Sequence, residues 1–207
     1  MNSKAIAEYK ARLHLTPRQC ELLVGMLLGD AHLERQSAQS VARLKVEHAV
    51  SQMEYVRWKY SEWQEWILTP PQVKKKWNRL GTVSSNVWFT TVSHPELEAY
   101  RAWFYDGRRK KVPSDLTLSP LTLAVWFMDD GSRKSYECRG LYLNTQAYRS
   151  EEIGLLQMIL ERDLRIHTTV RQQSDRLQIY IPSSEISHFV QIVQPYVIET
   201  MRYKLPG

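Results

Sequence analysis

Three carboxylates end two apolar runs of the chain, and their type and spacing could hold a metal ion. Residues 125–132 read ValTrpPheMetAspAspGlySer, so Asp129 and Asp130 end an apolar helical run, and Asp30 ends another run one hundred residues earlier. A helix C-terminus already carries about half a negative charge, so acidic residues are disfavoured there. The ordinary explanation is a solvated helix end with Gly131 as its C-cap. The alternative is a bound cation.

An internal repeat favours the cation. Residues 15–31 and 118–131 each open with Thr or Ser directly before Pro, which predicts an N-cap and a first helical position. Gln19 stands three residues after Thr16 and completes a capping box in the first copy. Each copy continues as an apolar helix and ends on an acidic residue at the matching position. A carboxylate that recurs at the same place in a repeat is unlike a random solvated one.

The two apolar runs are hydrophobic on all sides, which is typical of buried helices. Gly25, Gly29 and Ala124 would let the two helices approach closely, although Val125 opposite Gly25 makes the contact asymmetric. If the helices pack side by side and parallel, Asp30 and its repeat partner become neighbours. Two carboxylates at two negative helix ends need positive charge, and a hard divalent ion such as Mg²⁺ supplies it.

The flanking segments repeat as well. Polar and apolar residues alternate at 43–47, 72–79, 86–92, 141–146, 165–173 and 176–181, which predicts strands with one apolar face and one hydrogen-bonding face. LysValPro at 111–113 and LysLeuPro at 204–206 close the two copies. Each half therefore reads α-β-β-α-β-β-α in an α+β fold, with halves at 1–105 and 116–207 and a linker at 106–115.

The composition of the chain favours some classes of binding partner over others. Lys and Arg number 28 against 22 Asp and Glu, a net charge of +6 that favours a polyanion such as nucleic acid over an acidic protein or a membrane surface. The two cysteines, Cys20 and Cys138, have no metal-type spacing, and no apolar stretch is long enough to span a bilayer or to form a secretion signal. We expect an intracellular protein, located in a bacterial cytoplasm or nucleoid or in an organelle matrix or stroma.

Two stretches of the chain resemble the signature motif of a known family. LeuValGlyMetLeuLeuGlyAspAla (23–31) and LeuAlaValTrpPheMetAspAspGly (123–131) look like the two signature helices of single-chain LAGLIDADG homing endonucleases, which include free-standing intron-encoded members. The resemblance covers nearly the whole chain, from about Thr16 to Pro206. It implies two αββαββα halves with the motif helices at the interface and two antiparallel sheets that form a saddle over DNA.

The resemblance also implies site roles. The last acidic residue of each motif binds the metals, which places that role on Asp30 and Asp130; Gly29 and Asp129 precede them at the same metal site, and the role of Asp129 is left open. Basic residues after the last helix of each half lie near the scissile phosphates. Lys204 fits in the second half, whereas Lys110 and Lys111 are equally eligible in the first.

Further polar residues have weaker assignments. Glu47, His48 and Gln146 stand where family members place groups that order water or contact the backbone, and strand packing or solvation is the alternative for each. Polar side chains on the strand faces would read base edges in the major groove, with a solvated sheet face as the alternative. The expected DNA-contacting residues are Arg43, Lys45, Lys74, Lys76, Arg133, Lys134, Tyr142, Asn144, Arg165, His167, Arg171, Arg176 and Gln178.

The implied activity is hydrolysis of one phosphodiester on each DNA strand, with Mg²⁺ or Mn²⁺ activating water and the lysines stabilising developing charge. Because the two halves differ in sequence, we expect a monomer that cuts a long asymmetric double-stranded site. The alternatives are an RNA-binding intron maturase and a DNA-binding protein of the same fold that does not cut.

Overall fold

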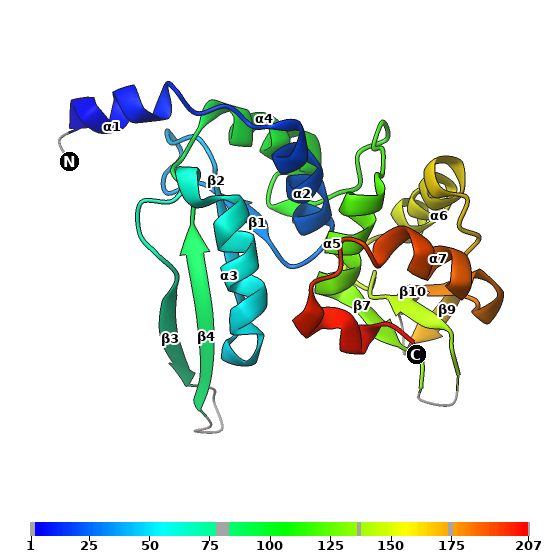
Figure 1. Ribbon diagram of the computed structural model, residues 1–207. Coiled ribbons are helices and arrows are strands. Elements are labelled where there is room, and N and C mark those ends of the chain that lie inside the picture. Colours follow the sequence, from blue (N-terminus) through cyan, green and yellow to red (C-terminus); the bar gives the residue numbers. More distant parts are fainter. Residues whose placement is uncertain (1–2, 78–82, 136–137, 174–175, 207) are drawn as a thin grey trace. The chain divides into compact units, whose positions relative to one another are not determined.

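The computed structural model describes residues 3–77, 83–135, 138–173 and 176–206 (Figure 1). The chain forms two compact units, one of Met1–Cys20 with Asp30–Trp103 and one of Glu21–Gly29 with Phe104–Gly207. The first apolar motif helix therefore begins in the first unit and contributes its remaining turns to the second. Within the described ranges no helix is both long and apolar enough to cross a bilayer.

The order of elements confirms two successive αββαββα sets. The first set is α2 (Pro17–Leu28), β1 (His32–Glu34), β2 (Arg43–Ala49), α3 (Met53–Glu62), β3 (Gln72–Trp77), β4 (Val83–Thr90) and α4 (Pro95–Phe104). The second set is α5 (Pro120–Asp130), β7 (Gly131–Arg133), β8 (Leu141–Leu143), α6 (Ser150–Leu164), β9 (Thr169–Gln173), β10 (Arg176–Ile181) and α7 (Ile186–Val193). The remaining elements are α1 (Ser3–Lys10), β5 (Tyr105–Asp106), β6 (Arg109–Lys110) and the 3-10 helices η1 (Val50–Gln52), η2 (Gln64–Trp66), η3 (Ser183–Glu185) and η4 (Glu199–Lys204).

Each unit holds one four-stranded antiparallel sheet, and the two sheets share one topology. Their strand orders are β1-β2-β4-β3 and β7-β8-β10-β9. The registers match too: His32 pairs with Lys45 in the first sheet and Ser132 with Tyr142 in the second, each two residues after the matched Asp. A residue of one sheet can therefore be assigned an equivalent in the other. The expected α+β class with antiparallel sheets is confirmed.

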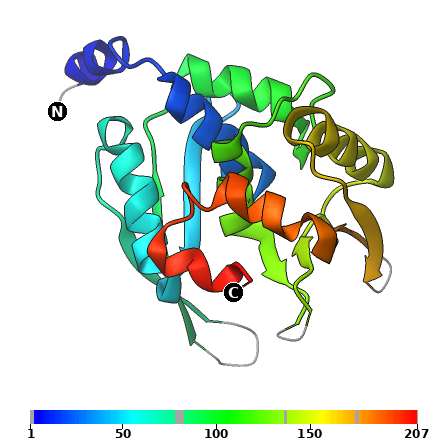
Figure 2. The ribbon, with the colours of Figure 1, turned by 45° about the vertical axis from the view of Figure 1, so that its right-hand side comes forward.

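The core of the first unit follows from alternation along β2. Leu44 and Val46 have no exposed surface, and α3 runs alongside β2 and β4 on that side (Figure 2). The Tyr60 and Phe89 rings meet edge to face with centroids 6.2 Å apart. The polar side chains between the buried positions therefore face the other side of the sheet.

The core of the second unit is built around α5, which is buried from Leu121 to Asp129. Helix α7 packs on it, with the Phe127 and Phe189 rings in edge contact at 5.0 Å, and α6 packs against β10. The Ser119 side chain accepts a hydrogen bond from the Thr122 N–H at 3.1 Å and caps the helix. Helix α5 is therefore buried on all sides, as its apolar sequence predicts.

The N-terminus of α2 is capped as the sequence predicts. The Gln19 N–H donates to the Thr16 hydroxyl at 3.1 Å, and the Gln19 side chain accepts from the Thr16 N–H at 3.1 Å. This reciprocal pair is the expected capping box.

The two motif helices touch through a small residue on one side and a larger one on the other. A Cβ added at Gly25 would lie 2.6 Å from the Thr122 carbonyl oxygen and 2.8 Å from the Val125 Cβ, closer than atoms can approach. The glycine therefore provides the space that Val125 fills. The contact is asymmetric, as the mismatch between the two motifs predicts.

One expectation about local structure is wrong. Strand β9 begins at Thr169, not at Arg165, because Arg165 ends α6 in the left-handed conformation (φ 56°) and breaks the alternation. His167 lies before the strand, with its Nδ1 2.6 Å from Glu161. The interval 106–115, expected to be the linker between the halves, contains part of the β5–β6 hairpin. The expected strand at 72–79 is observed to Trp77, beyond which it lies outside the described residues.

We predict that Gly25→Ala lowers the free energy of unfolding by about 1–3 kcal/mol, because the added methyl overpacks the helix contact. Gly154→Ala in α6 is the matched control. Its added methyl meets no atom within 4 Å, so we expect stability to rise by up to about 1 kcal/mol from helix propensity. Urea denaturation measures both; equal effects of the two substitutions would contradict the close contact.

Candidate active site

The end of α2 packs on Asp129. A Cβ added at Gly29 would lie 2.5 Å from both the Cβ and the Oδ2 of Asp129. Asp129 itself is only 8% exposed. The space that Gly29 leaves is therefore occupied by the Asp129 side chain. This assigns Asp129 a packing position against the other motif helix, at the residue that the repeat sets opposite it.

A lysine binds the carboxyl end of each motif helix. Lys110 Nζ donates to the Gly29 carbonyl oxygen at 2.7 Å. Lys204 Nζ donates to the carbonyl oxygens of Met128 and Asp129 at 2.5 and 3.0 Å. Gly29 and Asp129 are equivalent in the repeat, so the two lysines are equivalent as well. Each ammonium offsets the negative helix end that made the carboxylates costly.

Two further side chains cap the same helix ends. The Tyr148 hydroxyl donates to the Leu28 carbonyl at 2.9 Å, and Asn144 Nδ2 donates to the Asp130 carbonyl at 2.6 Å. Burial and, to a lesser degree, the charge of Asp130 raise the pKa of Tyr148, so its phenol stays protonated and remains a donor. The helix ends that carry the carboxylates are thus held by side-chain donors rather than left to solvent.

Lys110 is presented by the β5–β6 hairpin, which an ion pair braces. Arg109 Nη1 lies 3.0 and 2.8 Å from the two carboxylate oxygens of Glu152 on α6. Gly107 has φ +60°, the left-handed conformation that this tight turn requires. The Lys111 N–H bonds the Phe104 carbonyl at 2.8 Å. The geometry thus sets Lys110, not Lys111, at the helix end.

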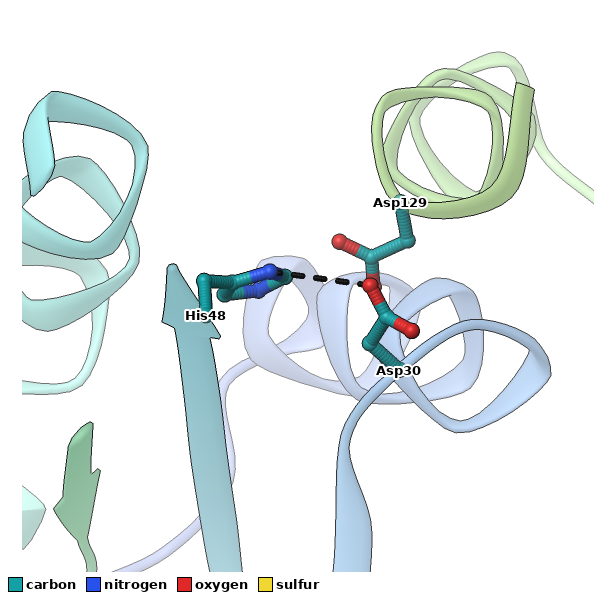
Figure 3. Close-up of side chains that lie close together, drawn as sticks. All are labelled: Asp30, His48 and Asp129. Carbon is teal, nitrogen blue, oxygen red and sulfur yellow. Dashed lines mark ion pairs between the residues drawn. The ribbon is translucent and has the colours of Figure 1, made fainter. Parts of the chain in front are cut away.

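In the first unit, Asp30 follows α2 and faces a histidine. His48 Nδ1 lies 3.5 Å from Asp30 Oδ2, and Figure 3 shows the ring directed at that carboxylate. The Asp30 side chain is 48% exposed, whereas the His48 side chain is only 2% exposed. Asp129, also drawn in Figure 3, projects from α5 and belongs to the second unit. Asp30 is therefore a half-exposed carboxylate with one oxygen beside a buried imidazole.

The polar face of the first sheet is a network of charges around Glu47. Lys74 Nζ donates to Glu47 Oε2 at 2.6 Å, Asn86 Nδ2 donates to Oε1 at 2.8 Å, and Lys45 lies 3.8 Å away. Arg43 bonds the neighbouring Glu34 at 2.6 Å. The expected residues Arg43, Lys45 and Lys74 thus share one face; Glu47 pairs with the two lysines and Glu34 with Arg43. The Lys76 side chain lies outside the described residues.

The polar face of the second sheet carries amides and aromatic rings instead. Gln178 Nε2 donates to Asn144 Oδ1 at 2.6 Å, and Gln146 Nε2 donates to Gln173 Oε1 at 2.7 Å. Tyr142 packs on the Tyr180 ring at 5.2 Å. Arg171 lies over the same Tyr180 ring at 5.0 Å, and Lys134 lies over it at 5.5 Å. The two faces therefore present different chemistry.

The remaining expected contact residues are placed less uniformly. Arg176 is exposed at the start of β10, whereas Gln178 is only 6% exposed and supports Asn144. Arg133 and Lys134 line a hollow together with Tyr203 and Lys204. Arg165 and His167, for the reasons given above, do not lie in the sheet.

Sequence reasoning missed a buried lysine beside His48. Lys59 of α3 is 1% exposed, and its Nζ lies 3.0 Å from His48 Nε2. The available signal is the helical spacing Tyr55, Val56 and Lys59, which puts the lysine in the apolar stripe of α3. Asn86 and Tyr148 were also missed because single polar residues in strands and loops carry no local pattern.

Known proteins match both the sequence and this architecture. Residues 20–189 match the LAGLIDADG DNA endonuclease family. A probable intron-encoded endonuclease of Wickerhamomyces canadensis is 30% identical over 217 residues, covering 99% of this chain and 91% of the relative. Cytochrome b mRNA maturase bI2 of Debaryomyces hansenii is 27% identical over 199 residues, covering 92% and 74%. The structure of the homing endonuclease I-WcaI with its DNA recognition sequence aligns with a TM-score of 0.93 and 28% identity, covering 99% and 93%.

Two motif helices with capped acidic ends and two four-stranded sheets of one topology define the single-chain form of a DNA endonuclease fold. The chain belongs to the LAGLIDADG DNA endonuclease family. The family and the class of enzyme expected from the two motifs are thereby confirmed.

We predict that the Arg109–Glu152 brace contributes to stability only above acidic pH. Burial alone would raise the pKa of Glu152, but hydrogen bonds from Arg109 and the Arg149 backbone, with the charge of Arg109, lower it overall from 4.5. A lowered folded-state pKa gives stability that is present above pH 4.5 and lost as pH falls through the folded value. Glu152→Gln should therefore cost about 1 kcal/mol at pH 7 and almost nothing near pH 3.

Urea denaturation at the two pH values measures this difference, and Glu151→Gln, an exposed neighbour in the same turn, is the control. A Glu152→Gln effect that does not change with pH would contradict the charged brace.

Proposed function

We propose that the protein is a site-specific double-strand DNA endonuclease that hydrolyses phosphodiesters with a divalent metal at Asp30 and Asp130. The observation that supports this proposal most strongly is the matched pair of helix ends, each followed or closed by an acidic residue. One lysine binds each end, Lys110 at Gly29 and Lys204 at Asp129. Each cation offsets a negative helix end. A reaction that develops negative charge at two phosphates would use the same two cations.

The donor set fits Mg²⁺ or Mn²⁺, which take carboxylate oxygens as ligands. Asp30 and Asp130 each follow a residue of the Gly29–Asp129 contact directly in the chain, which supports a shared role. Asp129 is packed against Gly29, so we assign it as a neighbour that shapes the site. When bound, the metal lowers the pKa of water and stabilises charge on phosphate oxygens.

The chain's own residues supply the remaining electrostatics. Lys110 and Lys204 are half-buried, and each is fixed by carbonyl acceptors, so their ammonium groups are preorganised before DNA binds. Such fixed charges stabilise a developing phosphorane more than mobile ones, because no reorganisation is needed during the reaction. We assign Lys110 rather than Lys111 to this role in the first half.

DNA recognition falls to the two sheet faces. The similar homing endonuclease I-WcaI was solved with its DNA recognition sequence, which supports DNA as the ligand of this chain. The first face offers charges around Glu47, and the second offers amides around Asn144, so the two half-sites should differ in sequence. A single chain with two unlike faces favours a monomer on a long asymmetric site, with salt-dependent binding. The intron-encoded relative supports the expected intracellular location in an organelle or a nucleoid.

A second candidate function is an RNA maturase, because one relative is a cytochrome b mRNA maturase. The two functions are compatible, since catalytic carboxylates do not prevent RNA binding elsewhere. Selection of cleaved sites from a random DNA library with Mg²⁺ separates them. Recovery of one long asymmetric site supports the endonuclease. Failure to recover any site, together with promotion of intron splicing, would support the maturase alone.

We predict that Asp30→Asn and Asp130→Asn each lower cleavage by at least about 10³-fold while DNA binding stays near normal, because the amide is a poor ligand for a hard cation. Cleavage should require Mg²⁺ or Mn²⁺ and stop with excess chelator. Single-turnover cleavage and gel-shift titration measure the two effects. Full cutting by either variant, or activity in chelator, would reject the metal assignment.

We predict that Lys110→Met and Lys204→Met slow cleavage about 10²-fold and weaken binding far less, because each removes a fixed charge used mainly in the transition state. Lys111→Met is the matched comparison, and its effect on the cleavage rate should be much smaller. Equal losses in rate and affinity would instead make these lysines simple phosphate anchors.

A further inference from the structure

A line of three polar side chains runs from the core of the first unit to Asp30. Lys59 Nζ lies 3.0 Å from His48 Nε2, and on the other side of the imidazole Nδ1 lies 3.5 Å from Asp30 Oδ2. Lys59 and His48 are 1% and 5% exposed. Two ionisable side chains are therefore buried in series behind the carboxylate that we assign to the metal.

The position of Lys59 is costly for a lysine. It lies in the apolar stripe of α3 beside Tyr55 and Val56, both fully buried. Taking an ammonium out of water is unfavourable unless nearby groups compensate it. The Tyr55 ring, whose centroid lies 4.3 Å from Nζ, provides partial compensation through its electron-rich face. An unbranched apolar residue such as Met would fill the same space without this cost, so packing does not explain the lysine.

The direction of the series depends on the charge of Lys59. An ammonium has three donors and no acceptor, so a charged Lys59 donates to His48 Nε2. A neutral imidazole that accepts at Nε2 carries its proton on Nδ1, and Nδ1 is the atom that faces Asp30. The ring therefore presents a donor to a carboxylate, which is an acceptor.

We propose that Lys59 is a positioning residue that holds His48 in the Nδ1–H tautomer and thereby orients the Asp30 carboxylate as a metal ligand. This inference rests on the proposed endonuclease function. Partners behind a metal ligand fix its orientation and raise its effectiveness as a ligand, and their loss costs affinity or rate. The Asp30 side chain, 48% exposed, is then held on the side that faces the buried imidazole.

The series of Lys59, His48 and Asp30 lies in the first unit, and the matched position in the second unit holds a different residue. By the matched strand registers, the equivalent of His48 in the second unit is Thr145, whose hydroxyl accepts from the Ile179 N–H at 3.1 Å. Thr145 is fully buried and supports the sheet. The second motif is held differently, by Asn144 on the Asp130 backbone carbonyl. The two motif ends are therefore supported by unlike residues.

The tautomer can be measured directly in the free protein by ¹⁵N NMR of the histidine rings, with the His48 signals assigned by their loss in His48→Asn. We expect wild-type His48 to show a protonated Nδ1 and an unprotonated Nε2. Lys59→Met, which keeps the length of the side chain, should abolish this preference. Protonation of Nε2 in the wild-type protein, or an unchanged tautomer in Lys59→Met, would overturn the inference.

Cleavage provides the second readout. We expect Lys59→Met to cut the target at least about tenfold more slowly at limiting Mg²⁺, the range typical of groups that orient metal ligands. DNA affinity and thermal stability should not fall, and raised Mg²⁺ should recover part of the rate. A loss of rate that tracks a loss of stability would make Lys59 a structural residue only.

A matched pair of substitutions at His48 tests the geometry. The Asn side-chain nitrogen occupies about the place of Nδ1, and the Gln nitrogen about the place of Nε2. His48→Asn should therefore slow cleavage less than His48→Gln, and adding Lys59→Met to His48→Asn should cost nothing further. The reverse order of the two His48 variants would reject a donor to Asp30.

These outcomes separate the inference from the proposed function. If the wild-type protein cuts no DNA with any divalent metal, the endonuclease proposal fails while the tautomer is still measured. If the wild-type protein cuts and Lys59→Met cuts equally well at limiting Mg²⁺ with its tautomer altered, only the positioning role of Lys59 fails.

Discussion

The placement of negative charge at two helix carboxyl ends is the constraint on which the rest of the structure depends. The backbone dipoles of α2 and α5 point their negative ends at the residues where the chain also places its acidic side chains. Side-chain donors bind the carbonyl groups at these helix ends. Lys110 and Tyr148 bind the end of α2, and Lys204 and Asn144 bind the end of α5. A partly buried cation at a helix end contributes up to about 2 kcal/mol. The lysines therefore stabilise the fold with the same ammonium groups that we propose act on phosphate.

The shared strand order of the two sheets makes differences between the halves interpretable. Glu47 and Asn144 occupy equivalent positions, yet Glu47 accepts from the Lys74 ammonium and the Asn86 amide, whereas Asn144 accepts from the Gln178 amide and donates to the Asp130 carbonyl. The two halves thus keep one scaffold and vary the side chains on it. The same holds behind the carboxylates, where His48 corresponds to Thr145. A common backbone with unlike side chains is how one chain can treat two DNA half-sites differently.

Local signals predicted much of the fold and part of the site. The Thr16–Gln19 box and the Ser119 cap are short-range hydrogen-bond patterns, so the starts of both motif helices could be read from the sequence. The choice between Lys110 and Lys111 could not, because it depends on a two-residue strand and an ion pair to α6. The start of β9 was misplaced because a left-handed helix end at Arg165 overrides an alternating pattern. Lys59 was missed because a buried lysine runs against the usual preference of that residue type.

The complementary fit of the motif helices bears on how such a chain can change over time. At both contacts the first helix contributes a glycine and the second contributes a side chain, Val125 at Gly25 and Asp129 at Gly29. Two copies of the second helix would bring the bulk of Val125 and the buried Asp129 carboxylate against themselves, without the glycines that accommodate them. The second helix therefore lacks the small residues that a close symmetric contact needs. Substitutions at Val125 or Asp129 should be inherited only with compensation at Gly25 or Gly29.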